Sequence, residues 1–199
     1  LAIANWISRV PAIRDELELT PAQVGLLLLA MSTGAVIALP SAGAVVQRMG
    51  PARTVAAGGI AACAGILVVG VGASALGSAA IVAVGLFAFG SGAGVWDVAM
   101  NVEGADVERC LERTVMPRFH AAFSLGTVAG VGAGALAAAA DLPLHMHLTG
   151  AAALILAGVL VSVRFFTPVA SADRSAGTAD RRHPLAAWRE ARTLLIGLM

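Results

Sequence analysis

Four long gaps separate the charged residues of this 199-residue chain, and these gaps decide what it can fold into. Each gap is a mostly apolar run that exceeds the about 20 residues needed to cross the hydrocarbon core of a bilayer. The runs are Leu19–Gln47, Thr54–Trp96, Phe119–Ala140 and Leu142–Val163. Charged residues make up 13% of the chain, against about 25% in ordinary soluble domains. The sequence therefore predicts an all-α integral membrane protein.

Turn-forming residues divide these runs into helical spans. Residues 72–78 are small and polar, and they break the longest run into a hairpin of two spans. Pro40 lies inside the second span, where a proline is expected to kink the helix. We expect the end of a first span over residues 1–10, then spans over 21–47, 52–72, 77–104, 117–140 and 143–164.

The spans define three regions of the chain. Residues 1–166 are expected to form a six-helix bundle whose first span is incomplete. Residues 167–186 have the polar, small-residue and proline composition of a flexible linker, and residues 187–199 begin a further apolar span that would open a second bundle. Since the chain does not begin with Met and stops within an apolar segment, we interpret it as part of a longer protein.

The arginines indicate how the bundle is oriented. Eleven of the 13 basic residues fall on the side that holds the connections near residues 48–53, 105–116 and 167–186, whereas the other side holds Arg9 and Arg14. Positively charged loops remain in the cytoplasm. We therefore expect these three connections to be cytoplasmic, in a multi-pass protein of the inner (plasma) membrane.

Composition and spacing disfavour several other classes of protein. The net charge of +1 provides no basic surface for nucleic acid. Cys63 and Cys110 form neither a disulfide framework nor a zinc motif, and His145 with His147 lacks a third metal ligand. The chain contains no lysine and no phosphate-binding glycine loop, which disfavours ATP-driven transport. We expect no enzymatic activity, no cofactor and no metal.

Asp97 is the clearest candidate for function within a span. Ionisable residues at membrane depth are costly and are functional by default. Asp97 and Asn101 share one helix face with Gly90, Gly94 and Gly104. Burial disfavours the charged form of a carboxyl group, so Asp97 is a candidate for exchanging protons. The alternative is an aspartate held ionised by a hydrogen-bond or arginine partner on a neighbouring span.

Two further features belong to this part of the chain. Glu103 is expected to reach cytoplasmic water. The spacing of Gly90 with Gly94, and of Gly126 with Gly130 and Gly134, predicts close packing of helices, with room for a moving helix or a substrate as the alternative.

A second polar stripe opens the fifth span, where His120, Ser124 and Thr127 lie at i, i+4 and i+7. Antiparallel neighbours would place His120 at a depth similar to that of Asp97. His120 is either a proton relay or a hydrated residue at a helix end. The two hydroxyls are either solute ligands or packing groups that bond back to their own helix.

The segment Trp96–Gly104, continuing through Glu108 and Pro117 to His120–Gly126, resembles the major facilitator superfamily, and more narrowly the branch that contains fucose permease. The resemblance implies twelve spans in two six-helix halves that work by alternating access. It further implies that Asp97 couples protons and that Asn101 and His120 line the solute cavity. Further candidates for the cavity are Ser124, Asn5 and Trp6, although Trp6 is also suited to anchoring a helix end at the membrane interface.

The loop between the second and third spans is similar to another motif of this superfamily. That motif reads Gly-x-x-x-Asp-Arg-x-Gly followed by basic residues, and Gln47 replaces its acid here. The chain also lacks the acid that fucose permease-like proteins carry late in the first span, and the fifth span lacks the glycine–proline motif of drug antiporters. The residues at the motif positions are Gly43, Gln47, Arg48, Gly50 and Arg53, of which Gln47 departs from the motif.

These features predict a secondary active transporter that moves a small polar solute, with sugars as one candidate class, driven by protons. Its partners would be the solute, protons, the lipid bilayer and the C-terminal half of the same chain. Two alternatives stay open: an efflux exporter of drugs or metabolites, and a non-transporting membrane protein that acts as a sensor or assembly partner.

Overall fold

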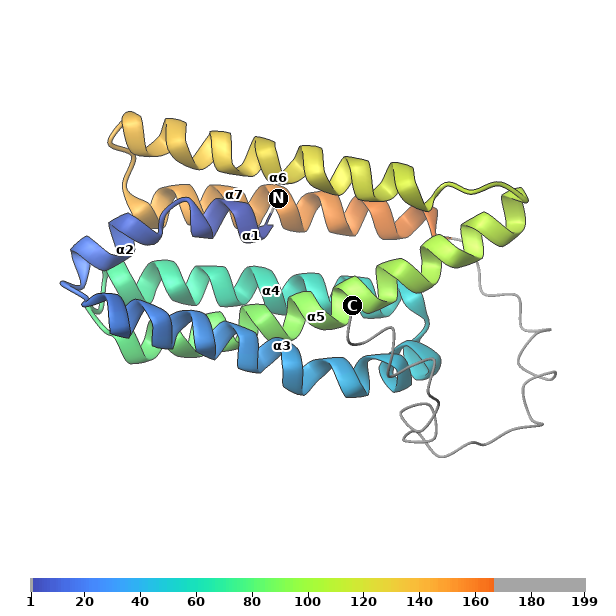
Figure 1. The fold of residues 1–199 in the computed structure, drawn as a ribbon, viewed down its shortest axis with the longest axis horizontal. Coiled ribbons are helices and arrows are strands. Elements are labelled where there is room, and N and C mark those ends of the chain that lie inside the picture. Colours follow the sequence, from blue (N-terminus) through green and yellow to red (C-terminus); the bar gives the residue numbers. More distant parts are fainter. Residues whose placement is uncertain (1, 167–199) are drawn as a thin grey trace. The chain divides into compact units, whose positions relative to one another are not determined.

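Antiparallel helices account for nearly all of the chain that the computed structural model describes, residues 2–166 (Figure 1). In chain order they are α1 (Ala2–Ile7), α2 (Val10–Glu16), α3 (Pro21–Met49), α4 (Pro51–Ser74), α5 (Ala79–Leu111), α6 (Met116–Ala139), α7 (Leu144–Ser162) and the short 3-10 helix η1 (Val163–Phe165). Residues 2–166 contain no strand. By length and composition, α3, α4, α5, α6 and α7 with η1 can each cross a membrane.

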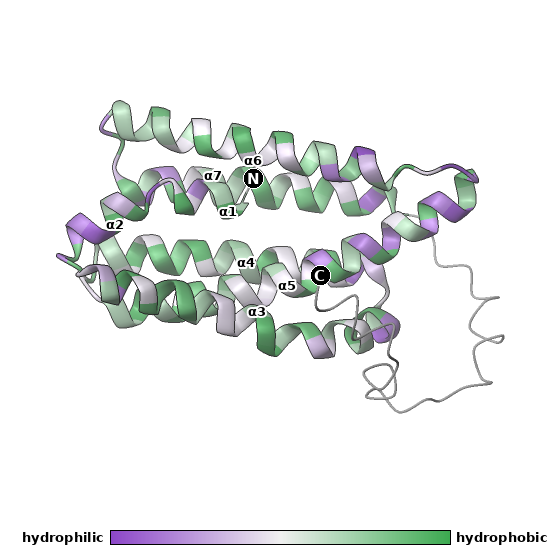
Figure 2. Cartoon of the chain, in the orientation of Figure 1, coloured by the Kyte–Doolittle hydropathy of each residue, from purple (hydrophilic) through white to green (hydrophobic). Residues whose placement is uncertain are grey.

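These helices confirm the all-α membrane fold and the order of the spans. Figure 2 shows apolar residues along most of their length and hydrophilic residues concentrated toward the helix ends. Local sequence explains where they begin. Thr20 caps α3 by accepting from the backbone of Gln23 while the Gln23 side chain accepts from the Thr20 backbone, and Pro21 occupies the first helical position. The expected linker over 167–186 and the further span over 187–199 lie outside the described residues.

Three connections differ from the prediction. The loop expected over 105–116 is mostly helix, because no glycine or proline follows Gly104 before Leu111 and Asp106 pairs with Arg109 one turn later. The loop expected over 48–53 is reduced to Gly50, whose φ of 80° is a conformation that glycine adopts without strain. The first span does not run on to residue 10, because α1 ends at Ile7 and a turn leads into α2.

Two groups of helices make up the bundle. In one, α5 packs against both α3 and α4, and in the other, α1 lies against α6 and α7 (Figure 1). Contacts between α4 and α7 join the two groups. The apolar core follows these contacts and includes Ile66, Leu86, Phe89 and Leu148, each at most 1% exposed.

Reciprocal pairs of glycines bring α4 and α5 together. A Cβ on Gly85 would lie 2.7 Å from the carbonyl oxygen of Gly65, and a Cβ on Gly92 would lie 2.6 Å from that of Gly58. Backbones this close leave no room for a side chain, and close approach is how helices gain contact in lipid. On another face of α5, a Cβ on Gly90 would meet the carbonyl oxygen of Met31. The prediction that Gly90 packs closely is therefore confirmed.

Candidate functional site

Asp97 lies in the middle of α5 with its side chain exposed in the described bundle. Its carboxylate has no hydrogen-bond or ion-pair partner among residues 2–166. The nearby Asn101 amide is half-buried and donates from Nδ2 to the backbone oxygen of Asp97 at 2.9 Å. Asp97 is therefore exposed in the described bundle rather than buried as expected, and no residue of 2–166 pairs with its carboxylate.

Glu103 differs from its neighbours on α5. Its side chain is only 6% exposed, so the expectation that it reaches water is wrong. The reason lies in the length of the helix: α5 continues for two further turns beyond Glu103, which keeps this residue within the bundle. Gly104 beside it packs against Met116 at the start of α6.

The polar stripe on α6 bonds mainly to its own helix. Ser124 Oγ donates to the backbone oxygen of His120 and Thr127 Oγ1 to that of Phe123, both at 3.0 Å. This confirms that the two hydroxyls bond back to their helix. The His120 and Ser124 side chains are exposed, and within residues 2–166 His120 forms no hydrogen bond with Asp97.

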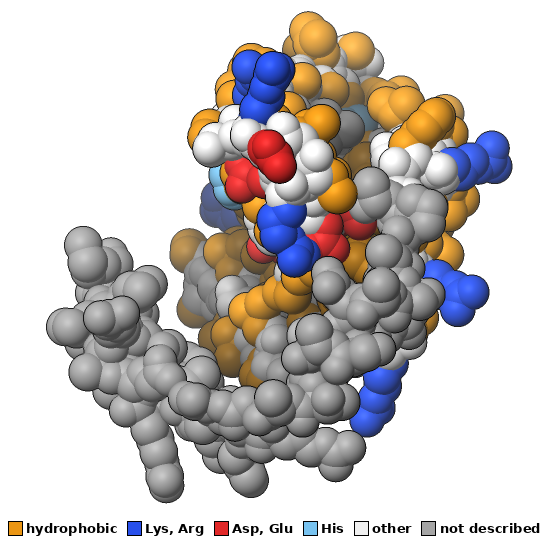
Figure 3. Space-filling view, turned by 90° about the vertical axis from the view of Figure 1, so that its right-hand side faces the viewer, with side chains coloured by type: hydrophobic (Ala, Val, Ile, Leu, Met, Phe, Trp, Pro, Cys, Tyr) orange, Lys and Arg blue, Asp and Glu red, His pale blue; other side chains and the backbone are white. Residues whose placement is uncertain are grey.

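The predicted loop motif lies at the end of the bundle where α3 passes into α4. Gly50 makes the turn, and the side chains of Gln47, Arg48 and Arg53 are exposed around it, while Gly43 is exposed one turn earlier. Figure 3 views this end of the described bundle and shows arginine side chains spread around it, with acidic side chains gathered on one part.

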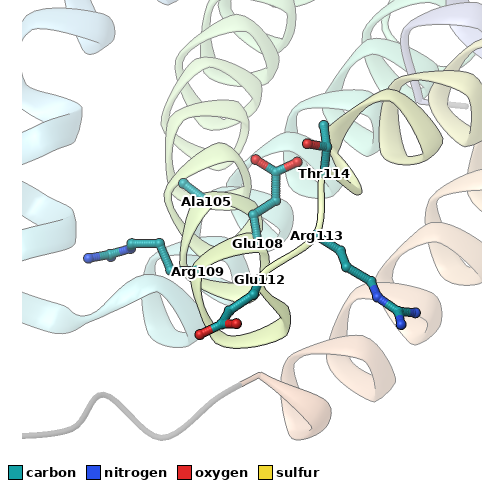
Figure 4. A pocket seen from close by; sticks show the side chains of 6 residues that line it. All are labelled: Ala105, Glu108, Arg109, Glu112, Arg113 and Thr114. Atoms are coloured by element: carbon teal, nitrogen blue, oxygen red, sulfur yellow. The ribbon is translucent and has the colours of Figure 1, made fainter.

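At the same end, an open pocket lies where α5 passes into α6, lined by Ala105, Glu108, Arg109, Glu112, Arg113 and Thr114 (Figure 4). Arg109 and Arg113 point away from each other, so the charged groups do not converge on a ligand. Glu108 has a structural task instead. Its Oε1 accepts hydrogen bonds from the backbone N–H groups of Val115 and Met116, both at 2.7 Å, and so caps the start of α6.

At the opposite end of the bundle, the structure buries a polar cluster that sequence reasoning did not assemble. We call Asn5, Trp6, Arg9 and His147 the buried polar cluster; their side chains are 4%, 2%, 5% and 8% exposed, respectively. His147 Nε2 on α7 lies 3.1 Å from Asn5 Oδ1 on α1, and Arg9 Nη2 donates to the backbone oxygen of Leu142 at 2.8 Å.

Two members of this cluster had been interpreted differently. Arg9 was counted with Arg14 on the less basic side of the membrane, and His147 was considered only as a possible metal ligand, whereas both are buried in the described bundle. The signal that could have found Arg9 is its spacing. It follows Asn5 by four residues and Trp6 by three, a spacing that places all three on one helix face. Asn5 and Trp6, proposed to line a cavity, pack in the interior of the described bundle.

No group of three or more potential metal ligands occurs among residues 2–166. Apart from the Asp106–Arg109 pair, no salt bridge is present in this part of the chain. The buried polar cluster therefore lies at one end of the described bundle, whereas the Asp97 side chain on α5 and those of His120 and Ser124 on α6 are exposed.

Comparisons with known proteins agree with this architecture. Over 147 residues the chain is 31% identical to the uncharacterised transporter y4wD of Sinorhizobium fredii, an alignment that covers 74% of this chain and 38% of the relative. Over 132 residues it is 30% identical to an uncharacterised MFS-type transporter of Yersinia pestis, covering 66% and 33%. The chain thus spans less than half the length of these relatives, and no solved structure matches it. The profile that matches residues 2–198 is that of the Major Facilitator Superfamily, and the chain belongs to this family.

Proposed function

We propose that the protein containing this chain is a secondary transporter that moves a small polar solute by alternating access and couples its movement to protons through Asp97. The observation that carries the proposal is the Asp97 carboxylate itself. It lies in the middle of a membrane-spanning helix, exposed in the bundle and without a partner among residues 2–166. A charged group at membrane depth is energetically costly, and its presence there therefore indicates a function.

The family supports the general mechanism. Transporters of this kind place their solute and ion sites near the middle of the membrane, between two bundles that rock around them. Exposed polar side chains of α5 and α6 are the candidates for such a site. Asp97 lies on α5 with the half-buried Asn101 one turn later, and His120 and Ser124 lie on α6.

The solute proposed here is small and polar, and sugars are the first class to test because of the resemblance to the fucose permease branch. In this arrangement Asn101, His120 and Ser124 donate and accept hydrogen bonds at the solute. Asn5 and Trp6 act from the interior of the bundle, where they shape α1. The exposed Gln47, Arg48 and Arg53 around Gly50 control the change between the two open states from the cytoplasmic side.

The test uses the full-length protein in de-energised cells, with external pH recorded as sugars and other small metabolites are added one at a time. Alkalinisation on adding one compound is the expected result, because a symporter carries protons inward with its solute. Asp97→Asn should abolish this signal. Asp141→Asn is the matched control, because Asp141 is exposed in the connection between α6 and α7 and should leave the signal intact.

A second measurement separates coupling from binding. Solute exchange across vesicles without a proton gradient should persist in Asp97→Asn if Asp97 serves only to couple protons, whereas loss of exchange would assign it to solute binding. Normal alkalinisation in Asp97→Asn would overturn the proposal. If no compound changes the pH although the protein is in the membrane, the symport proposal fails and drug-accumulation assays test the exporter.

A further inference from the structure

Arg9 stands out in the buried polar cluster because its charge has no counterion. The guanidinium is 5% exposed, and no carboxylate of residues 2–166 lies within 4.0 Å of it. Its sole hydrogen bond there runs from Nη2 to the backbone oxygen of Leu142, an uncharged acceptor. Burying an unpaired charge is strongly unfavourable, so this site calls for a negative charge that the bundle does not provide.

Four side-chain atoms of the buried polar cluster lack a partner among residues 2–166, and three of them, on Arg9 and Trp6, are donors; the fourth is His147 Nδ1. Within the described bundle, Nε and Nη1 of Arg9 and Nε1 of Trp6 are inaccessible to solvent and have no acceptor. Arginine and tryptophan nitrogens can donate but not accept. A ligand for the Arg9 and Trp6 atoms must therefore carry hydrogen-bond acceptors.

The two residues are joined closely. The backbone N–H of Arg9 donates to the backbone oxygen of Trp6 at 2.9 Å, in the turn that ends α1. Residues three apart lie on the same side of a helical turn. The His147 ring on α7 lies near enough for the charge of Arg9 to act on it. His147 is engaged with Asn5 through Nε2, and an imidazole carries no negative charge that could balance Arg9.

From these observations we propose that Arg9 and Trp6 form a binding site for a small monovalent anion, such as chloride or a short carboxylate, at the end of α1 next to the connection between α6 and α7. One guanidinium charge matches one negative charge. Because both side chains are at least 95% buried, the anion must be small and must shed its water. A water molecule could accept from one of these donors but would leave the charge of Arg9 unbalanced.

Such an anion would stabilise the contact between the end of α1 and the α6–α7 connection, since Arg9 already donates to the backbone oxygen of Leu142 there. This role is separate from solute transport through Asp97. The experiment therefore measures binding and stability, and its outcome is independent of whether the transport proposal holds.

The test follows thermal unfolding of the purified full-length protein in sodium gluconate, with gluconate replaced by chloride or acetate at constant ionic strength. We expect the midpoint to rise and saturate with chloride, with acetate or with both, because the bound anion stabilises the folded state. The two salts distinguish a halide site from a carboxylate site. If neither salt raises the midpoint above its value in gluconate, the proposal is overturned.

Two variants and one control locate the effect. Arg9→Gln should abolish the rise in the midpoint. Trp6→Phe keeps the charge and removes one N–H group, so it should weaken the apparent anion affinity about tenfold, the effect of one charge-assisted hydrogen bond. Arg14→Gln should respond as the wild type does, since Arg14 is exposed on the neighbouring helix α2.

If Arg9→Gln does not fold, Trp6→Phe decides the question, because each variant is compared with its own midpoint in gluconate. A response of Trp6→Phe equal to that of the wild type at every anion concentration would contradict the assignment.

Discussion

We call Asp97 and Asn101 on α5, together with His120 and Ser124 on α6, the stripe. The stripe and the buried polar cluster contain similar kinds of side chain in opposite situations. In the cluster, Asn5 and Arg9 reach other helices or connections, and their side chains are buried. In the stripe, Asn101 and Ser124 bond to the backbone of their own helices, and Asp97 has no partner among residues 2–166. Polar groups in the cluster are therefore part of what holds the fold, whereas those of the stripe remain available for a ligand or for another part of the protein.

The largest difference in lost free energy of unfolding is expected between substitutions of two aromatic residues, Trp6 and Phe123. Trp6→Ala should lower the free energy of unfolding by about 3–5 kcal/mol, because it leaves a cavity where a 2% exposed side chain packed. Phe123→Ala on α6 removes a side chain that is 53% exposed and should cost less than about 1 kcal/mol. Unfolding of the full-length protein in mixed SDS micelles measures both. Equal losses would mean that the exposed side of α6 is as tightly packed as the cluster.

A smaller difference in lost free energy of unfolding is expected between substitutions of two asparagines, Asn5 and Asn101. Asn5→Ala leaves the buried His147 without its partner and should cost about 1–2 kcal/mol, since hydrogen bonds between membrane helices reach about 1.7 kcal/mol. Asn101→Ala removes a bond within one helix and should change stability by less than about 0.5 kcal/mol. The same unfolding assay compares them.

A double-mutant cycle of Asn5→Ala with His147→Ala isolates the contact between α1 and α7. We expect a coupling energy of about 0.6 kcal/mol or more. A coupling indistinguishable from zero would show that the two side chains do not depend on each other, and the cluster would then be held by packing alone.

The fold could be predicted from sequence because each of its determinants is local. Charge-free runs predicted the spans, and the structure places the start of α3 at Pro21, the first residue of the expected span over 21–47. The end of α5 was harder to predict. The charged residues after Gly104 were interpreted as a loop, although none of them breaks a helix. Charge indicates contact with water, whereas glycine, proline and capping groups are the local signals for a helix end, and neither glycine nor proline follows Gly104 before Leu111.

The candidate site was harder to predict, because burial depends on residues far apart in the chain. Arg9 and Leu142 are separated by most of the bundle in sequence, and so are Asn5 and His147. No pattern around Arg9 alone reveals that the α6–α7 connection covers it. For the same reason Glu103 was placed in water, although it is buried. The roles assigned to Asp97, Asn101 and His120 stay predictions, because they depend on the function of the full-length protein.

The smallest effect on stability is expected at Ser124, and it tests whether the stripe serves a ligand. Ser124→Ala removes a bond to the backbone of its own helix, so the free energy of unfolding should change by less than about 0.5 kcal/mol. If Ser124 contacts the solute, its loss should raise the KM for uptake about threefold to tenfold, the effect of one neutral hydrogen bond. Thr127→Ala removes an equivalent backbone bond from a less exposed position and serves as the control. An unchanged KM in Ser124→Ala would remove this residue from the proposed site, and a loss of stability above about 1 kcal/mol would place it with the groups that hold the fold.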